Sequence, residues 1–302
     1  LYVDPVERGF RGRPTVINNV ETLANVPRIL DRGPAWFAAM GAGEVSGDCV
    51  TGSTGTKVLG ISGEVVNTGL VEVPMGTGLR ELVFDVAGGP AGDAGLKAAQ
   101  VGGPSGVILP ESGLDIELEH DALAEAGASL GSGMVTVMDR DTCMVRYALY
   151  CTELLLDESC GKCAPCREGL AAMSSILKRI TDGGGAEEDI GLLEELGSTM
   201  SECSICGLGR RASAPVLSTI RSFPEEYAAH IEEGRCPAGQ CTELIRFEIS
   251  AERCTGCTAC GEACPTDAIS GEPGETHVID DQACIRCGMC RDVCRFDAVE
   301  VR

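Results

Sequence analysis

CTGCTACGEACP (Cys254–Pro265) and CIRCGMCRDVC (Cys284–Cys294) are the two stretches that determine how the last part of this chain folds. Both contain the spacing C-x2-C-x2-C-x3-C, and the second run repeats the first at an offset of 30 residues, from Cys254 to Cys284. Three thiols spaced in this way lie on one short loop and converge on a common point. Convergent thiolates are ligands for soft metal centres, so the repeat predicts two metal centres in one small domain.

The spacing is that of bacterial proteins with two iron–sulfur clusters, in which the fourth cysteine of each run binds the cluster of the other run. We therefore expect one [4Fe-4S] cluster on Cys254, Cys257, Cys260 and Cys294, and another on Cys284, Cys287, Cys290 and Cys264. The exchange brings the two clusters close together, which suits rapid electron transfer. A pair of zinc sites is the alternative. Arg295 replaces the proline of the first run, and we expect its charge to raise the potential of the second cluster.

Composition and charge narrow the class of protein. The chain has 302 residues, of which 44% are hydrophobic, enough for several globular domains. Its formal net charge of −22 disfavours nucleic acids and anionic membranes as partners. No apolar run is long enough for a membrane span, and no stretch is typical of a signal peptide, so we expect a cytoplasmic protein. A secreted disulfide framework is the alternative for so many cysteines, but it is typical of shorter chains.

A third run, SCGKCAPCREG (Ser159–Gly169), places Cys160, Cys163 and Cys166 on one loop. It has no fourth cysteine three residues later, so the closing ligand of a third [4Fe-4S] cluster has to come from elsewhere. We prefer Cys206 in CGLG, because the flanking glycines let the backbone approach a cluster closely. Cys203 is the competing candidate.

Hydrophobic patterning predicts two kinds of structure before the ferredoxin-type repeat. A helix is expected near 18–30, a hairpin over 57–66 and 70–73, a helix over 78–86 and a strand over 135–138, which together indicate a small α+β unit. Further helices are expected over 143–156, with Asp141 as N-cap, and over 168–180, 187–200 and 215–230. These four helices predict a bundle around the third cluster.

Several motifs carry a family resemblance. SCGKCAPCREG followed by CGLG, GRPTVINNVETLANVP (Gly12–Pro27), VGGPSGVILPES (Val101–Ser112) and LAEAGASLGSGMVTVMDRDTCMV (Leu123–Val145) resemble the NADH-oxidising flavoprotein of respiratory complex I, the F-subunit family. With its added ferredoxin repeat, the chain is most similar to the NADH-oxidising beta subunit of electron-bifurcating [FeFe] hydrogenases and related NAD-linked formate dehydrogenases.

The resemblance implies an α+β multidomain fold. Residues 1–49 would be the end of an FMN- and NADH-binding domain whose N-terminal part is missing, and 50–130 a β-grasp, soluble-ligand-binding domain. Residues 131–235 would form the helical bundle with one [4Fe-4S] cluster, 236–248 a linker, and 249–302 the ferredoxin domain with two.

The resemblance also implies an activity. The chain would be an electron-transfer subunit of an NADH:acceptor oxidoreductase, with NAD(H) as substrate and FMN as the flavin, and with Asn18, Asn19 and Thr22 beside FMN. A helix N-cap is the alternative role for these three residues. Expected partners are a thioredoxin-like [2Fe-2S] subunit, a hydrogenase or formate dehydrogenase catalytic subunit, and soluble ferredoxin. The family's Gly-rich flavin loop lies upstream of this segment, so the alternative is a non-catalytic iron–sulfur subunit without its own flavin.

The linker carries a possible zinc site. Cys236 and Cys241 flank a Pro-Ala-Gly-Gln turn, and His230 precedes them by six residues. Two thiolates and an imidazole suit tetrahedral zinc. We prefer Cys143 as the fourth ligand, with Cys151 and Cys203 as alternatives; free thiols or a [2Fe-2S] cluster are the competing interpretations. The two remaining histidines, His120 and His277, are expected at the surface.

Overall fold

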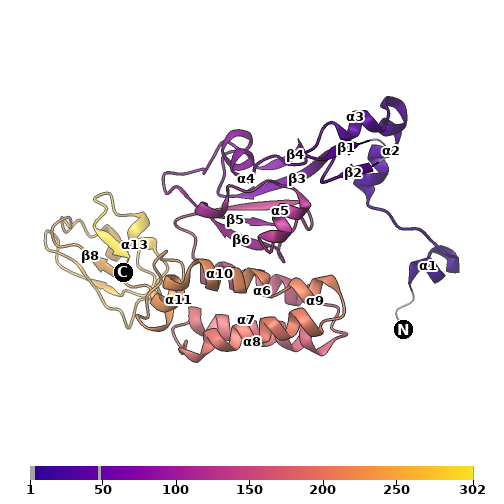
Figure 1. Ribbon diagram of the computed structural model, residues 1–302. Coiled ribbons are helices and arrows are strands. Elements are labelled where there is room, and N and C mark those ends of the chain that lie inside the picture. The colour runs from indigo at the N-terminus through magenta and orange to yellow at the C-terminus, as the bar shows by residue number, and fades with distance from the viewer. Residues whose placement is uncertain (1–3, 47–48, 302) are drawn as a thin grey trace.

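The computed structural model describes residues 4–46 and 49–301. Figure 1 shows four successive parts: an extended N-terminal segment, a sheet with short helices, a helical bundle beside that sheet, and a small C-terminal module at the end of the bundle. The order follows the chain, from indigo to yellow.

The N-terminal segment contains short elements around one longer helix, α2. These elements are α1 (Pro5–Arg8), η1 (Phe10–Gly12), α2 (Val20–Arg32), α3 (Pro34–Ala38), β1 (Glu44–Ser46) and β2 (Cys49–Thr51). The expected helix near 18–30 is confirmed, and Asn19 caps it, since its Oδ1 accepts from the backbone N–H of Glu21 at 2.9 Å. The apolar face of α2 is uncovered by the described residues, with Val20 80% and Leu30 81% exposed.

A five-stranded sheet forms the next part. Its strands are β3 (Thr56–Gly63), β4 (Gly69–Pro74), β5 (Leu96–Val101), β6 (Val107–Pro110) and β7 (Met134–Asp139), in the order β4-β3-β7-β5-β6. The β3–β4 hairpin is the one that the sequence predicts, and β3 and β7 run parallel whereas the other pairs are antiparallel. β7 lies in the middle of this sheet, so the domain boundary expected at residue 130 falls too early.

Short helices cover the sheet. α4 (Leu79–Glu81) continues as the π-helix η2 (Leu82–Val86), and η3 (Glu111–Gly113) and α5 (His120–Glu125) follow. Leu79, Leu82 and Leu123 of these helices are fully buried in one core with the strand residue Leu59. The helical spacing expected over 78–86 therefore has its physical basis in packing against the sheet.

The bundle consists of six helices. They are α6 (Met144–Asp157), α7 (Ala164–Thr181), α8 (Glu188–Cys203), α9 (Gly207–Arg211), α10 (Ala214–Ser222) and α11 (Pro224–Ile231). Two expectations were wrong. Cys143, not Asp141, caps α6, because its Sγ accepts from the backbone N–H of Arg146 at 3.4 Å. The helix expected over 215–230 is broken at Phe223, which is non-helical (φ −136°, ψ 48°) and is followed by Pro224.

Sheet and bundle share a small buried contact. Ala98, Ile108 and Met138 of the sheet pack against Met144 and Phe223. The backbone N–H of Ile108 donates to the Ser218 hydroxyl at 3.0 Å, and the Tyr147 hydroxyl donates to Oε1 of the buried Gln100 at 2.7 Å. These directional bonds fix how the two layers meet.

The C-terminal module is a structural repeat. It contains η4 (Thr242–Leu244), β8 (Phe247–Ile249), α12 (Ala259–Glu262), β9 (Ile269–Ser270), β10 (Val278–Ile279), α13 (Met289–Asp292) and β11 (Val299–Val301), with β8 paired to β11 and β9 to β10. Residues 251–270 and 281–300 have the same sequence of turns, helix and strand. The 30-residue repeat in the sequence is therefore a repeat in the fold.

Gly63, at the end of β3, lies where the parallel strands β3 and β7 pack closely together. A Cβ there would collide with the Val137 carbonyl oxygen, and φ is +88°. Gly127 has a similar φ of +70° but open space around it. We expect Gly127→Ala to cost about 1–2 kcal/mol of unfolding free energy and Gly63→Ala roughly twice that or more. Urea unfolding followed by circular dichroism measures both, and equal costs would contradict the packing described.

Candidate metal centres and the N-terminal cavity

The first hollow of the C-terminal module is lined by four thiols. Cys254, Cys257 and Cys260 reach it from one loop, and Cys294 reaches it from the other repeat. Ile249, His277, Phe296 and Val299 also line it. Its thiols are the set that the ferredoxin spacing predicts for the first cluster.

The second hollow is built in the same way. Cys284, Cys287 and Cys290 come from the second loop and Cys264 from the first repeat, with Phe247, Thr266, Ile269 and Met289 around them. The backbone N–H groups of Ala268 and Ala298 donate to Cys264 Sγ and Cys294 Sγ, each at 3.3 Å. Such amides stabilise thiolate charge and tune a bound cluster. The two crossing cysteines thus accept equivalent backbone hydrogen bonds, and Cys264 also has the Thr266 hydroxyl at 3.7 Å.

Two expectations about this module need correction. We expected the charge of Arg295 to act on the second cluster. The residues on either side of it, Cys294 and Phe296, line the first hollow instead. His277 is not at the surface; it is only 3% exposed and lines the first hollow. His120 is exposed, as expected.

The third set of cysteines lies where two helices of the bundle begin. Cys163 is the N-cap of α7, Cys166 lies in its first turn, and Cys206 is the N-cap of α9. The positive end of the α7 dipole favours thiolate charge at this place. The Ser159 hydroxyl lies 3.4 Å from Cys166 Sγ, which gives that thiolate a hydrogen-bond donor.

The surroundings of Cys166 distinguish Cys206 from Cys203. Burial raises the pKa of the Cys166 thiol, and the neighbouring thiolates of Cys163, Cys206 and Cys160 raise it further. Cys203, the last residue of α8, is not among these neighbours. The pKa of Cys163 is lowered, chiefly by a hydrogen bond from the backbone of Ile205. The segment before Cys206 therefore lies against the cysteine loop of α7.

Two further observations fit a cluster at this place. The Ser204 hydroxyl is buried and lies beside Cys163, where a hydrogen bond from it helps to lower the pKa of that thiol. A Cβ on Gly209 would lie 2.7 Å from Ser204 Cβ and 3.1 Å from Cys166 Cβ, so only glycine lets α9 approach the loop. A buried hydroxyl donor beside converging thiols is suited to cluster sulfur.

Four residues form a much tighter group at the linker. The ligand atoms of Cys143, His230, Cys236 and Cys241 all lie within 4.8 Å of one another, and all four residues are buried. His230 Nε2 lies 3.4 Å from Cys143 Sγ and 3.3 Å from Cys241 Sγ, and the two sulfurs are 3.7 Å apart. The structure thus brings together the residues that the sequence predicts as a zinc site. Cys151 lies instead beside Gln100.

The four side chains of this group offer three sulfur atoms and one ring nitrogen to a cation. Burial alone would lower the pKa of His230, but hydrogen bonds to the thiolates of Cys143 and Cys236 raise it to about 10. His230 Nδ1 donates to the Glu226 carbonyl at 2.6 Å, which leaves Nε2 for a ligand. The Glu226 carboxylate accepts from the N–H of Met144 at 3.0 Å and pairs with Lys97 at 2.6 Å. Three thiols, one oriented imidazole and burial suit tetrahedral zinc.

A large cavity separates α2 from the sheet. It has a volume of about 700 Å³ and is lined by residues of α2, of the loop after β2, of α5 and of α9. Asn19 and Thr22 line it, but Asn18 does not. Asn19 also caps α2, so both roles considered from the sequence apply to it.

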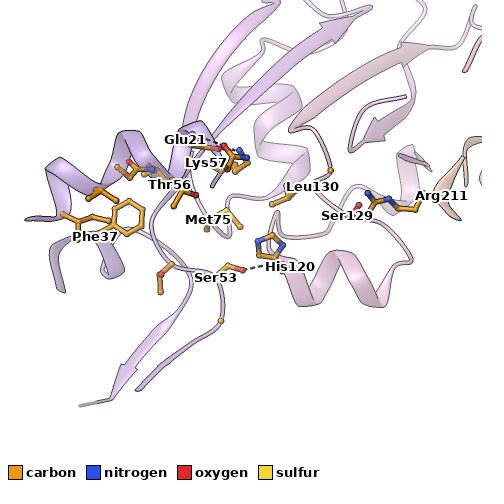
Figure 2. A pocket seen from close by; sticks show the side chains of 18 residues that line it. Glu21, Phe37, Ser53, Thr56, Lys57, Met75, His120, Ser129, Leu130 and Arg211 are labelled. Atoms are coloured by element: carbon orange, nitrogen blue, oxygen red, sulfur yellow. Dashed lines mark hydrogen bonds and ion pairs between the residues drawn. The ribbon is translucent and has the colours of Figure 1, made fainter. Parts of the chain in front are cut away.

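Figure 2 shows polar and charged side chains around this cavity for which the sequence predicted no role in a site. Lys57 pairs with Glu21 on one side, His120 lies in the middle with its backbone N–H on the Ser53 hydroxyl at 3.2 Å, and Arg211 of α9 lies at the other end. Arg211 is on the helix that begins at Cys206. The cavity therefore extends from α2 to the neighbourhood of the third set of cysteines.

Comparison with known families accounts for two parts of the chain. Residues 146–230 match the model of the NADH-ubiquinone oxidoreductase-F iron-sulfur binding region, and residues 253–299 match that of the 4Fe-4S dicluster domain. The chain is homologous to the F subunits of NADH-quinone oxidoreductases. Both matched regions contain cysteine sets described above, so the chain holds [4Fe-4S] binding regions of this family.

Individual relatives extend this likeness. The NADP-reducing hydrogenase subunit HndC of Solidesulfovibrio fructosivorans is 42% identical over 98% of this chain and 59% of its own length. The F 2 subunit of the NADH-quinone oxidoreductase of Rhizobium meliloti (strain 1021) is 44% identical over 77% of this chain and 53% of its own length. An NAD+-reducing [NiFe]-hydrogenase in the H2-reduced state superposes with a TM-score of 0.64 at 34% identity, over 76% of this chain and 36% of that chain.

The chain therefore spans little more than half the length of these curated relatives. Within 4–46 and 49–301, every helix is too short or too polar to span a bilayer.

Replacing Cys206 and Cys203 separately tests the closing ligand of the third set. We expect Cys206→Ser to remove about a third of the iron of anaerobically prepared protein, one cluster in three. Cys203→Ser should leave the iron content unchanged, because Cys203 is not among the thiolates that raise the pKa of Cys166. The opposite pattern would assign the site to Cys203.

Gly209 offers a test that changes no ligand. Gly209→Ala places a methyl group against Ser204 and Cys166, so we expect partial loss of iron from the third cluster only. Gly191→Ala, in an open position of α8, is the matched control and should retain all iron. Iron analysis and EPR of both proteins decide the matter, and full occupancy in Gly209→Ala would contradict the close approach of α9.

Proposed function

We propose that this chain is an electron-transfer part of an NADH:acceptor oxidoreductase, with three [4Fe-4S] clusters as its one-electron carriers. The observation that carries this proposal is the gathering of twelve cysteines into three sets of four, one in the bundle and two in the C-terminal module. The names of the relatives, NADH-quinone oxidoreductase subunits and an NADP-reducing hydrogenase subunit, support the same function.

The residues would divide the work as follows. Cys160, Cys163, Cys166 and Cys206 hold the bundle cluster, and the crossed sets described above hold the other two. Backbone N–H groups at Ala268 and Ala298 stabilise the thiolates, and buried apolar residues such as Phe247 and Val299 exclude water. When bound, such clusters accept and release single electrons.

The N-terminal cavity would take part of the flavin. Asn19 and Thr22 line it, as the family resemblance implies for FMN, and Lys57, His120 and Arg211 add groups suited to an anionic ligand. Asn18 does not line the cavity, so we leave it out of the proposed FMN contacts. The exposed apolar face of α2 suggests that residues 1–49 belong to a larger FMN- and NADH-binding domain.

The proposed domain organisation follows from the elements. A β-grasp-type domain would include β3 to β7 and end near residue 140, the bundle would continue to about residue 235, and 249–302 would be the ferredoxin domain. The linker over 236–248 would be fixed to the bundle by zinc on Cys143, His230, Cys236 and Cys241. This zinc would be structural, because four protein ligands leave no open position.

The proposed setting is a multisubunit complex in the cytoplasm. Its partners would be a thioredoxin-like [2Fe-2S] subunit and the catalytic subunit of a hydrogenase or a formate dehydrogenase, with soluble ferredoxin as a further partner. The net charge of −22 favours basic redox partners. The alternative is a non-catalytic iron–sulfur subunit without its own flavin, which the same cysteine sets would also serve.

Anaerobic addition of NADH to the purified product of the whole gene separates these two functions. We expect flavin absorbance, its bleaching by NADH, and EPR signals of reduced clusters. A flavin in the cavity would lie near the proposed bundle cluster, because Arg211 of α9 lines the cavity. Clusters that dithionite reduces but NADH does not, in protein without flavin, would favour the non-catalytic subunit.

Metal analysis tests the zinc site. We expect Cys236→Ser to lower the zinc content to well below one per chain and to reduce thermal stability, since zinc binding and folding are coupled. Cys151→Ser is the matched control, a buried thiol of α6 outside the group, and should keep its zinc. Unchanged zinc in Cys236→Ser would rule out the site, and iron at this place would favour a [2Fe-2S] cluster.

A further inference from the structure

The two hollows of the C-terminal module are related position by position. Subtracting 30 from each residue number of the second loop gives its counterpart in the first, so that Cys284 corresponds to Cys254 and Ile279 to Ile249. Left-handed backbone recurs at the same offset, at Asp267 and Asp297 and at Gly256 and Arg286. Differences between equivalent positions are therefore differences between the two clusters.

Gly256 and Arg286 form the most unequal of these pairs. Both have a left-handed φ, +67° at Gly256 and +57° at Arg286, within the loop that supplies three thiols. Glycine is the residue that this conformation favours, and an L-residue adopts it at a cost in free energy. The second loop thus carries an arginine at a strained position where the first loop has glycine.

A side chain fits at position 286 but not at position 256, because different segments pack against the two loops. In the first repeat a Cβ on Gly256 would collide with the backbone N of Glu275 and lie 2.5 Å from the Gly274 backbone, so no side chain fits. In the second repeat the equivalent segment leaves room, and Arg286 Nη1 donates to the Glu243 carbonyl at 3.3 Å and its carboxylate at 3.2 Å. The guanidinium is fixed between the linker and the loop.

The inner edge of this guanidinium has no acceptor. Arg286 Nε is buried and has no hydrogen-bond partner among the described residues, whereas its outer edge faces the half-exposed carboxylates of Glu243 and Asp281. Ile285 and Cys287, on either side of Arg286, line the second hollow, and the backbone N–H of Arg286 donates to Cys284 Sγ at 3.4 Å. An orphan buried donor in a native structure calls for an explanation.

We propose that Arg286 sets the reduction potential of the cluster on Cys264, Cys284, Cys287 and Cys290, and this rests on the proposed function. Its guanidinium is permanently charged, and reduction adds one electron, hence one negative charge, to the cluster. A fixed cation and a buried N–H donor on the loop that carries three of the thiolates stabilise the reduced form more than the oxidised form. Arg286 therefore makes this cluster easier to reduce than it would be with glycine, the residue of the first loop.

Potentiometric titration of the full chain, followed by EPR, tests this role. We expect Arg286→Gly and Arg286→Gln to shift one cluster by at least tenfold in its reduction equilibrium towards the oxidised form, which is about 59 mV for a one-electron couple. Arg286→Lys, which keeps the charge, should recover most of the shift. Arg246→Gln is the matched control, because Arg246 also faces Asp281, at 3.6 Å, but is 71% exposed; it should move neither cluster.

Several results would overturn the proposal. Three concern the potentials: no change in Arg286→Gln, equal shifts of both clusters of the module, or a shift of the same size in Arg246→Gln. The fourth is loss of iron from both Arg286→Gly and Arg286→Gln, which would mean that Arg286 only holds the loop in place. The unaltered protein tests the proposed function separately, because that function fails if the module shows no reducible clusters at all.

Discussion

The structure depends on one constraint, which is that four thiolates would have to meet at each proposed iron–sulfur cluster although no segment supplies all four. In the C-terminal module the two repeats exchange Cys264 and Cys294, so neither hollow is complete without the other half. In the bundle α8 connects α7 to α9, and Cys206 at the start of α9 is the proposed fourth thiolate for the loop before α7. The fold is the means of bringing distant cysteines together.

Cysteines of the candidate metal centres are part of the hydrophobic core. The core of the bundle includes Cys163 and Cys166 together with Leu170 and Met200, and the same continuous core extends to Cys260 and Cys290 of the module. The compact group at Cys143 and Cys241 lies between them, where α6 begins and the linker passes. Bundle and module thus share one apolar core, and the proposed clusters would lie along it.

The sequence predicted those parts of the candidate sites whose ligands lie close together in the chain. It predicted less well the features that depend on tertiary contacts. The spacing of the two ferredoxin-type runs predicted which cysteines line each hollow, because thiols on one short loop must lie close together. The zinc-type group was predicted from donor chemistry around one turn. In contrast, the place of β7 depends on pairing with strands far along the chain. The cap at Cys143 and the break at Phe223, directly before Pro224, are local features that the helical pattern alone did not reveal. The burial of His277 and the strained backbone of Arg286 follow from the repeat packing on itself.

Iron content with EPR is the most direct measurement of the account. Protein prepared without oxygen should contain about twelve irons per chain, four for each of three cubane clusters, and should give cluster signals on reduction with dithionite. Far fewer irons per chain, with no such signals, would contradict the assignment of the three cysteine sets and with it the proposed electron-transfer function.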